Sequence, residues 1–110
     1  MSDIEKLAEI FQILSDPTRL RLIRLLAQQP SGEDRGEPCN GGGFLCVNAL
    51  AHRLGVTQSA VSQHLRLLRQ VGLVRGERRG RFVHYSLNQD GLTLYKSILL
   101  EALGESSLAE

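Results

Sequence analysis

The pattern that runs through residues 46–87 limits the possible fold of this chain more than any other feature. CVNALAHRLG has a short helical spacing of apolar residues that ends at Gly55, and a second helical pattern, TQSAVSQHLRLLRQ, begins at Thr57. GLVRGERRGRFVHYSL follows, with two short alternating strand patterns around an arginine-rich tip. Helix, tight turn, helix and basic hairpin in this order predict a winged helix-turn-helix, whose second helix enters the major groove of DNA.

Length and composition favour a single small domain. The chain has 110 residues, so we predict one domain over residues 1–110. Aromatic residues are only 5% of the chain, so the core has to consist mostly of Leu, Ile and Val. No run of about 18 apolar residues is present, so no membrane-spanning helix is expected. The first residues, MSDIEKLAEI, lack the apolar core of a signal peptide, and we therefore expect a cytoplasmic protein.

Charge is unevenly distributed, although the net charge of the whole chain is only +1. Residues 53–81 contain seven arginines and one acid, a net charge of +6, whereas the rest of the chain contains six basic and eleven acidic residues, a net charge of −5. Arginine suits bidentate contacts with phosphate and guanine better than lysine does. This concentration of arginine favours a nucleic-acid partner over a merely solvated charged face.

Two helices are predicted before this basic region. Residues 3–14 place apolar side chains on one helical stripe, and Ser15-Asp16-Pro17 ends that helix and starts the next. Asp16 can cap the second helix, and Pro17 fits its first position because no N–H is needed there. We expect this helix, roughly 17–28, to bury Leu20, Ile23 and Leu26 or their neighbours. Its polar side is expected to carry three arginines, Arg19, Arg21 and Arg24.

The segment between the two pairs of helices is predicted to be a loop. Residues 30–43, PSGEDRGEPCNGGG, contain five glycines, two prolines and no large apolar residue. Phe44-Leu45 is expected to form a short strand beside the hairpin. The predicted organisation is a glycine-rich loop at 30–45, a helix-turn-helix at 46–70, a wing at 73–88 and a last helix at 89–104.

The first and last helices carry more apolar residues than one small core needs. In the last helix these residues are Leu92, Tyr95, Leu99 and Leu103. Both helices could simply cover this domain, but we favour packing against a second copy, because a two-fold pair places two reading helices about one DNA turn apart. The predicted fold is therefore mainly α with a small β-hairpin, five helices plus a wing, forming a homodimer through the first and last helices.

On these motifs the chain resembles the ArsR/SmtB family of small dimeric bacterial repressors. LSDPTRLRLIRLL at 14–26 resembles the family's second-helix signature, and LAHRLGVTQSAVSQHLRLLRQVGLVRGERRGRFVHYSL at 50–87 resembles its DNA-reading segment. The resemblance implies a homodimeric repressor that binds a double-stranded DNA operator and is released by a metal, a metalloid or an oxidant.

Two effector motifs of that family can be compared with this sequence. Many of its arsenic and metal sensors carry Cys-Val-Cys at the start of the first motif helix, whereas this chain has Cys46-Val47-Asn48. Because Asn48 replaces the second thiol, a standard three-thiolate arsenite site is not expected. Other members bind zinc-type metals between their last helices through Asp and His. The last helix here has Asp90 but no His, and we predict that this site is absent.

The predicted DNA contacts are the polar residues at the start of the second motif helix and the arginines of that helix and the wing. Glutamine can bond bidentately to adenine, and serine can reach base edges or phosphate. A helix N-terminus favours a phosphate, so Thr57 suits a cap and a phosphate contact. Wing arginines can reach phosphates or the minor groove. The full predicted set is Thr57, Gln58, Ser59, Ser62, Gln63, His64, Arg66, Arg78, Arg79 and Arg81.

Cys39 and Cys46 are the only cysteines, and three interpretations of them remain open. They could ligate arsenite, antimonite or a soft metal ion as an inducer, with a third ligand from water, His52 or the other subunit. They could form a reversible disulfide, since the glycines between them allow their Cα atoms to approach. They could also be incidental. Lone histidines such as His52 and His84 are more often structural or solvent-facing than ligands.

The sequence therefore predicts a dimeric DNA-binding repressor that needs no cofactor and is switched by a thiol-reactive effector at Cys39 and Cys46. A winged-helix module for protein interaction that has lost DNA binding is the alternative, and the arginine distribution argues against it. An enzyme is not expected, because no paired carboxylates, nucleophile-base pair or phosphate loop is present, and Cys39 and Cys46 lack the Cys-x-x-Cys spacing.

Overall fold

The computed structural model describes residues 2–28 and 46–104, except for the side chain of Arg79. Its elements follow in the order α1 (Asp3–Leu14), α2 (Pro17–Ala27), α3 (Val47–Leu54), α4 (Gln58–Gln70), β1 (Val74–Arg79), β2 (Phe82–Leu87) and α5 (Gln89–Ala102). This order confirms the predicted helices, the helix-turn-helix and the wing. None of the described helices is both long and apolar enough to cross a membrane.

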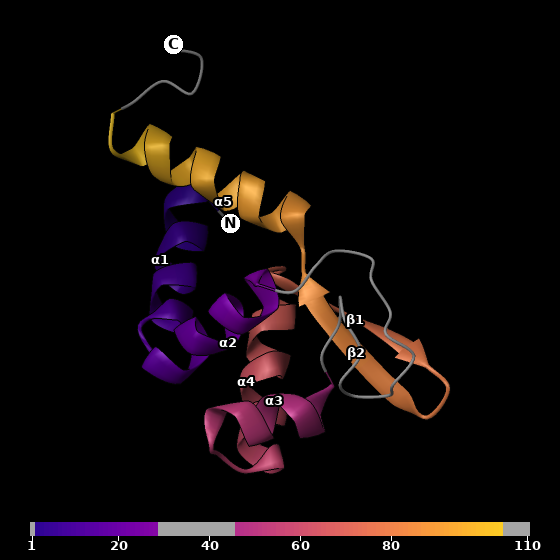
Figure 1. Ribbon diagram of the computed structural model, residues 1–110. Helices are drawn as coiled ribbons and strands as arrows, with labels where there is room; N and C mark the ends of the chain where they lie inside the picture. The colour runs from indigo at the N-terminus through magenta and orange to yellow at the C-terminus, as the bar shows by residue number, and fades with distance from the viewer. Residues whose placement is uncertain (1, 29–45, 105–110) are drawn as a thin grey trace.

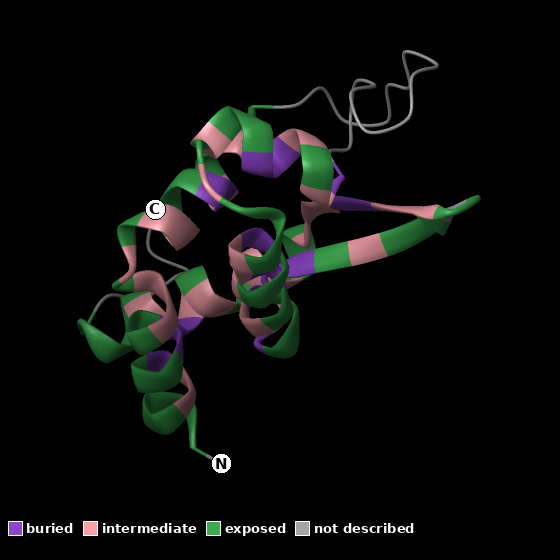
Figure 2. Ribbon diagram, turned by 90° about the horizontal axis from the view of Figure 1, so that it is seen from below, coloured by how far each residue is buried: buried purple, intermediate pink, exposed green. Residues whose placement is uncertain are grey.

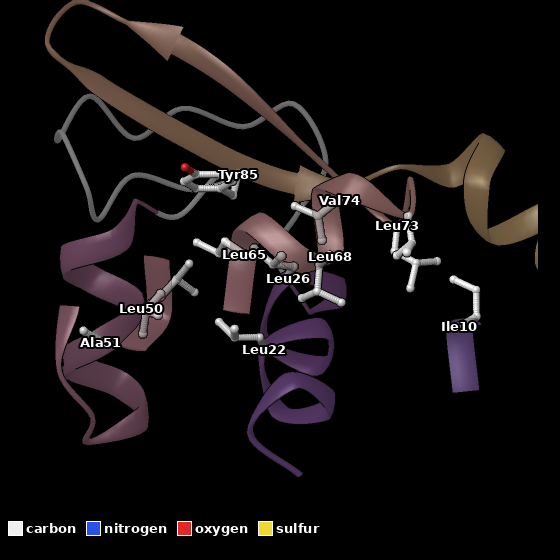
Figure 3. Close-up of a cluster of buried hydrophobic side chains, with 12 residues drawn as sticks. Ile10, Leu22, Leu26, Leu50, Ala51, Leu65, Leu68, Leu73, Val74 and Tyr85 are labelled. Carbon is white, nitrogen blue, oxygen red and sulfur yellow. The ribbon is translucent and has the colours of Figure 1, made fainter. Parts of the chain in front are cut away.

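The elements form a helical body from which the hairpin projects. α5 packs against α1 at one end of the molecule, and α3 packs against α4 at the other, with α2 between them (Figure 1). The main core lies between α2, α3, α4 and the base of the hairpin, where Leu22, Leu50 and Leu68 are completely buried (Figure 3). Since most of its members are aliphatic, the prediction of an aliphatic core is confirmed.

The first two helices begin at side-chain caps. The Ser2 hydroxyl accepts a hydrogen bond from the Glu5 N–H, and a Glu5 carboxylate oxygen accepts one from the Ser2 N–H, both at 3.3 Å. Asp16 caps α2 by accepting a hydrogen bond from the Thr18 N–H at 2.7 Å, and Pro17 occupies the first helical position. The predicted cap and the predicted proline position are both confirmed.

The buried face of α2 differs from the prediction. Leu22 and Leu26 are buried, whereas Leu20 is 49% exposed, so Leu26 and a neighbour of the named residues are in the core and Leu20 itself is not. Arg19, expected on the polar side, is only half exposed and lies against α4. The buried stripe is rotated because α2 packs on α3, α4 and β2 together, and the periodicity of one helix does not show which neighbours it will have.

The helix-turn-helix is delimited at the predicted residues. Gly55 ends α3 with φ +71°, a left-handed conformation that glycine adopts without strain, and Thr57 caps α4 by accepting a hydrogen bond from the Ala60 N–H at 3.0 Å. Val61, Leu65 and Leu68 of α4 are buried, so the apolar residues of this helical pattern face the core. Cys46 stands at the N-cap of α3 but forms no side-chain cap hydrogen bond there.

The wing is an antiparallel hairpin whose strands pair from Val74 with Leu87 to Arg79 with Phe82. Gly80, with φ +65°, turns the chain at the predicted tip. Tyr85 packs into the core, and its ring lies over Gly76, where an added Cβ would be 3.1 Å from the ring edge. The predicted loop at residues 30–43, the Phe44-Leu45 strand and Cys39 lie outside the described residues.

Candidate nucleic-acid interface

α4 presents a polar edge on the side opposite its buried apolar residues. The side chains on this edge are exposed, and they are Thr57, Gln58, Ser59, Ser62, Gln63 and Arg66. Their positions follow from the helical period, because Val61, Leu65 and Leu68 turn the other side of α4 toward the core. The first turn of α4 contains no acid, so its positive dipole end and its N–H groups, apart from the Ala60 N–H that Thr57 caps, are available to an anion.

Gln58 is oriented by a contact that the sequence analysis did not anticipate. The Gln58 side-chain N–H donates to the Asn48 side-chain oxygen at 2.9 Å, which links the first turn of α4 to the first turn of α3. The second N–H and the carbonyl oxygen of Gln58 remain, and these are the two groups that a bidentate contact with adenine requires.

His64 lies at the inner boundary of the polar edge, half-buried against α2. Arg19 donates from Nε to His64 Nδ1 at 3.1 Å and from Nη1 to the Ile13 carbonyl oxygen at 3.0 Å. The guanidinium of Arg19 therefore connects the end of α1 with the middle of α4. Because Nδ1 of His64 already accepts a hydrogen bond from Arg19, the predicted contact of His64 with DNA cannot use that ring nitrogen.

Asp16 lies beside this link. The pKa of Asp16 is lowered, first by the hydrogen bond from the Thr18 N–H, while desolvation opposes this effect. The hydrogen bond from the Arg19 main-chain N–H and the charge of the Arg19 guanidinium make smaller contributions in the lowering direction. The negative charge of Asp16 is therefore stabilised at the point where the α2 N-terminus faces α4.

The wing carries basic side chains away from the helical body. Arg75, Arg78 and Arg81 are exposed, and Figure 2 shows the exposed tip of the hairpin extending from the molecule. Long guanidinium side chains on a projecting hairpin can reach a phosphate backbone beside the groove that α4 enters. The side chain of Arg79 lies outside the described part of the hairpin.

The cysteines and histidines do not form a metal cluster within the described residues, where no group of three or more His, Cys, Asp or Glu could hold an ion. Cys46 is 3% exposed and is disulfide-bonded. The other cysteine of the chain, Cys39, is outside the described part. His52 is exposed on α3, and His84 is buried in β2, in agreement with the expectation that these histidines are solvent-facing or structural.

A separate apolar surface lies on α1 and α5, which pack against each other. Large hydrophobic side chains on these two helices are exposed by 39–68%, and they are Ile4, Phe11, Leu94, Leu100 and Leu103. Several large hydrophobic residues left exposed on two adjacent helices are typical of a surface that another protein chain covers.

Comparisons with known proteins agree with this geometry. A family profile described as a helix-turn-helix domain matches residues 14–77, more than half of the chain. A transcriptional repressor SmtB homolog from Synechocystis sp. is 38% identical over 99 residues, which cover 89% of this chain and 64% of the relative. The arsenical resistance operon repressor of Escherichia coli is 36% identical over 80 residues, which cover 73% of this chain and 57% of the relative. The chain thus spans 57–64% of the length of these relatives.

A solved structure shares the fold over most of its length. It is the homodimeric winged helix-turn-helix DNA-binding domain Mb0332 from Mycobacterium bovis, described as a possible ArsR-family transcriptional regulator. The TM-score is 0.64 at 25% sequence identity, and the match covers 90% of this chain and 80% of that chain.

Proposed function

Because the chain belongs to the ArsR/SmtB family of winged helix-turn-helix transcriptional regulators, we propose that it is a dimeric repressor that binds a double-stranded DNA operator. Membership of this family also confirms the expectation of a regulator rather than an enzyme. The single-domain organisation over residues 1–110 and the cytoplasmic location remain predictions.

The observation that carries the proposal is the polar, acid-free edge of α4 together with the exposed arginines of the wing. We expect α4 to enter the major groove with its N-terminal turn, where Gln58 and Gln63 can contact adenine and Ser59 and Ser62 can contact bases or phosphates. Thr57 and Arg66 are assigned to backbone phosphates, and Arg78, Arg79 and Arg81 to the phosphates or minor groove beside them. His64 is assigned to the edge of this interface, where Arg19 holds its ring.

Dimerisation through α1 and α5 is supported by the exposed apolar residues of these helices. Phe11 is 50% exposed and Leu103 is 68% exposed, a state that costs free energy in water and that a second copy would relieve. A two-fold axis at this surface would place one α4 on either side of it, as a palindromic operator requires. The homodimeric state of Mb0332 supports dimer formation by this chain.

The effector is proposed to act on Cys39 and Cys46, because Cys46 stands at the N-cap of α3, the helix that packs on α4. If the effector is an oxidant, the two thiols lose two electrons and two protons to a peroxide. The peroxide is reduced to water, and one disulfide bond forms. The disulfide at Cys46 supports this form. In the inducer form, the two thiolates bind arsenite, antimonite or a soft metal ion, which the name of the arsenical resistance relative supports.

The DNA-binding part of the proposal is tested by electrophoretic mobility shift at two salt concentrations, using a duplex selected from random DNA. Affinity is expected to fall steeply as salt rises, because neutralised phosphates release counterions. Arg78→Ala should weaken binding, whereas the control Arg24→Ala, which removes an exposed arginine of α2, should leave it unchanged. A chain that bound no duplex at low salt would instead be a protein-interaction module, and the proposal would be wrong.

The effector part is tested by release of the same duplex by arsenite, cadmium, zinc and peroxide. Wild type is compared with Cys39→Ser, Cys46→Ser and the double variant under reducing and oxidising conditions. We expect either the metal and metalloid ions or the peroxide to release the wild-type protein from the duplex. The same agents should leave all three variants bound. Normal release of the double variant by every agent would show that the cysteines sense nothing.

A further inference from the structure

The start of α5 is hydrogen-bonded to the chain segment that leaves α4. Tyr95 Oη donates to the Val71 carbonyl oxygen at 2.8 Å, and the Asn88 side-chain N–H donates to the Gly72 carbonyl oxygen at 3.0 Å. The Asn88 main-chain N–H donates to the Leu73 carbonyl oxygen at 2.9 Å. We refer to these five residues, Val71, Gly72, Leu73, Asn88 and Tyr95, as the α4–α5 joint.

Close backbone packing accompanies these bonds. Gly91 in the first turn of α5 lies so near Gly72 that an added Cβ would overlap the Gly72 carbonyl oxygen and would lie 3.0 Å from its carbonyl carbon. Gly72 itself has φ +83°, so the turn that leaves α4 also depends on glycine. At Gly91 the backbone of α5 is therefore in direct contact with the backbone of the turn.

The joint supplies hydrogen-bond donors to the turn that follows α4. Tyr95 and Asn88 donate to the Val71 and Gly72 carbonyls, whereas the carbonyls of Leu67, Leu68 and Arg69 in the last turn of α4 accept bonds from main-chain N–H groups of that turn. Asn88 also accepts a hydrogen bond from Arg75 of the wing at 3.1 Å. Partial burial raises the pKa of Tyr95, with a smaller contribution from Glu9, and so further favours the protonated hydroxyl that donates to Val71.

We propose that the α4–α5 joint is a positioning element that sets the spacing of the two reading helices and thereby selects operators by the distance between their half-sites. This inference rests on the proposed function, because it requires a dimer that forms through α1 and α5. α5 carries the apolar dimer surface, and the joint connects that helix directly to the end of α4 and to the wing.

The dimensions of DNA set the size of the α4 movement that such a joint must prevent. One base pair corresponds to about 3.4 Å along the helix axis and to about one tenth of a turn. In a symmetric dimer each α4 would have to move by only about half of that rise to accommodate an operator that is longer by one base pair. Three hydrogen bonds and a direct backbone contact can restrict movement on this scale, whereas apolar packing alone tolerates sliding.

Two variants remove parts of the joint with little other change. Tyr95→Phe removes one oxygen atom and retains the ring. Asn88→Ala removes the contacts with Gly72 and Arg75, and it removes no cap, because the Asn88 side chain forms no cap hydrogen bond in α5. Thr93→Ala is the control, since Thr93 is exposed on the same helix.

The experiment measures dissociation constants for palindromic duplexes selected by wild type and then respaced by −2, −1, 0, +1 and +2 base pairs, together with a single half-site. Sedimentation measures the oligomeric state of each variant. We expect both joint variants to remain dimeric and to bind the half-site like wild type. Their affinity for the best spacing should fall by about fivefold in Tyr95→Phe, which loses one hydrogen bond, and by at least as much in Asn88→Ala, which loses two. Their discrimination against the other spacings should shrink by a similar factor, and Thr93→Ala should match wild type.

If the joint only stabilised the fold, each variant would lose the same fraction of active protein at every spacing. The dependence of its affinity on spacing would then match that of wild type, and the inference would be overturned. A wild-type spacing profile in Tyr95→Phe would overturn it even if Asn88→Ala failed to fold. A monomeric wild type, or one that bound no duplex, would reject the proposed function and this inference together. A dimer with normal binding and an unaltered profile would reject the inference alone.

Discussion

Gly91→Ala tests the close contact between α5 and the end of α4. In an ordinary helix this change would stabilise the chain by up to about 1 kcal/mol, because alanine has the higher helix propensity. Here the new Cβ would overlap the Gly72 carbonyl oxygen. A backbone atom cannot rotate away as the end of a flexible side chain can, so α5 or the turn has to move.

The magnitude follows from the two opposing effects. Overpacking at a close contact costs about 1–3 kcal/mol. If the joint opens to relieve the overlap, the bonds from Asn88 and Tyr95 are weakened, and each contributes about 0.5–1.5 kcal/mol. After subtraction of the propensity gain, we expect a net loss of about 1–3 kcal/mol in the free energy of unfolding, or a fall of roughly 5–15 °C in Tm for a domain of this size.

The assay is thermal and urea unfolding followed by circular dichroism, with all variants at one protein concentration because a dimer's stability depends on it. Thr93→Ala is the matched control, since it raises helix propensity at an exposed position of the same helix and should be neutral or slightly stabilising. A Gly91→Ala protein as stable as Thr93→Ala would refute the argument, because the contact would then exert no steric restriction.

Three further outcomes are expected from the described contacts. Leu50→Ala, at a fully buried position, should lower the free energy of unfolding by about 2–5 kcal/mol in urea titrations. The lowered pKa of Asp16 means that its contribution is present above the ordinary aspartate pKa and is lost as pH falls through the lower folded value. Asp16→Asn, which keeps a capping side chain, should therefore flatten the acid limb of a stability–pH profile. Arg78→Ala should reduce the salt slope of DNA binding by about 0.9 if its guanidinium neutralises one phosphate, and an unchanged slope would show that it touches none.

The boundaries of the helices were predictable because they are encoded by local chemistry. Asp16 and Pro17 start α2, Gly55 ends α3 and Thr57 starts α4, and each of these effects involves neighbours within a few residues. The wing was predictable for a similar reason, since Gly80 lies between two alternating runs. Local signals of this kind do not depend on which elements later pack together.

The contacts that orient the candidate interface were not predictable in the same way. The Arg19–His64 bond joins residues 45 positions apart, and Asn48 and Gln58 belong to different helices. A polar residue on a helix has the same sequence pattern whether it faces DNA, water or another polar side chain. Leu20 shows the converse, since an apolar residue in register with a core stripe is exposed once α2 packs on its actual neighbours.

Gly91 is the position at which a sequence signal for a long-range contact was present. A glycine inside a predicted helix costs about 1 kcal/mol relative to alanine, so its presence suggests a compensating requirement elsewhere in the fold. The structure supplies that requirement in the Gly72 carbonyl, 19 residues earlier in the chain. A residue with a low helix propensity inside a helix, such as Gly91, therefore indicates a contact between elements more clearly than a residue with a high propensity does. For this chain the coupled elements are the helix that carries the apolar surface and the helix that carries the polar edge.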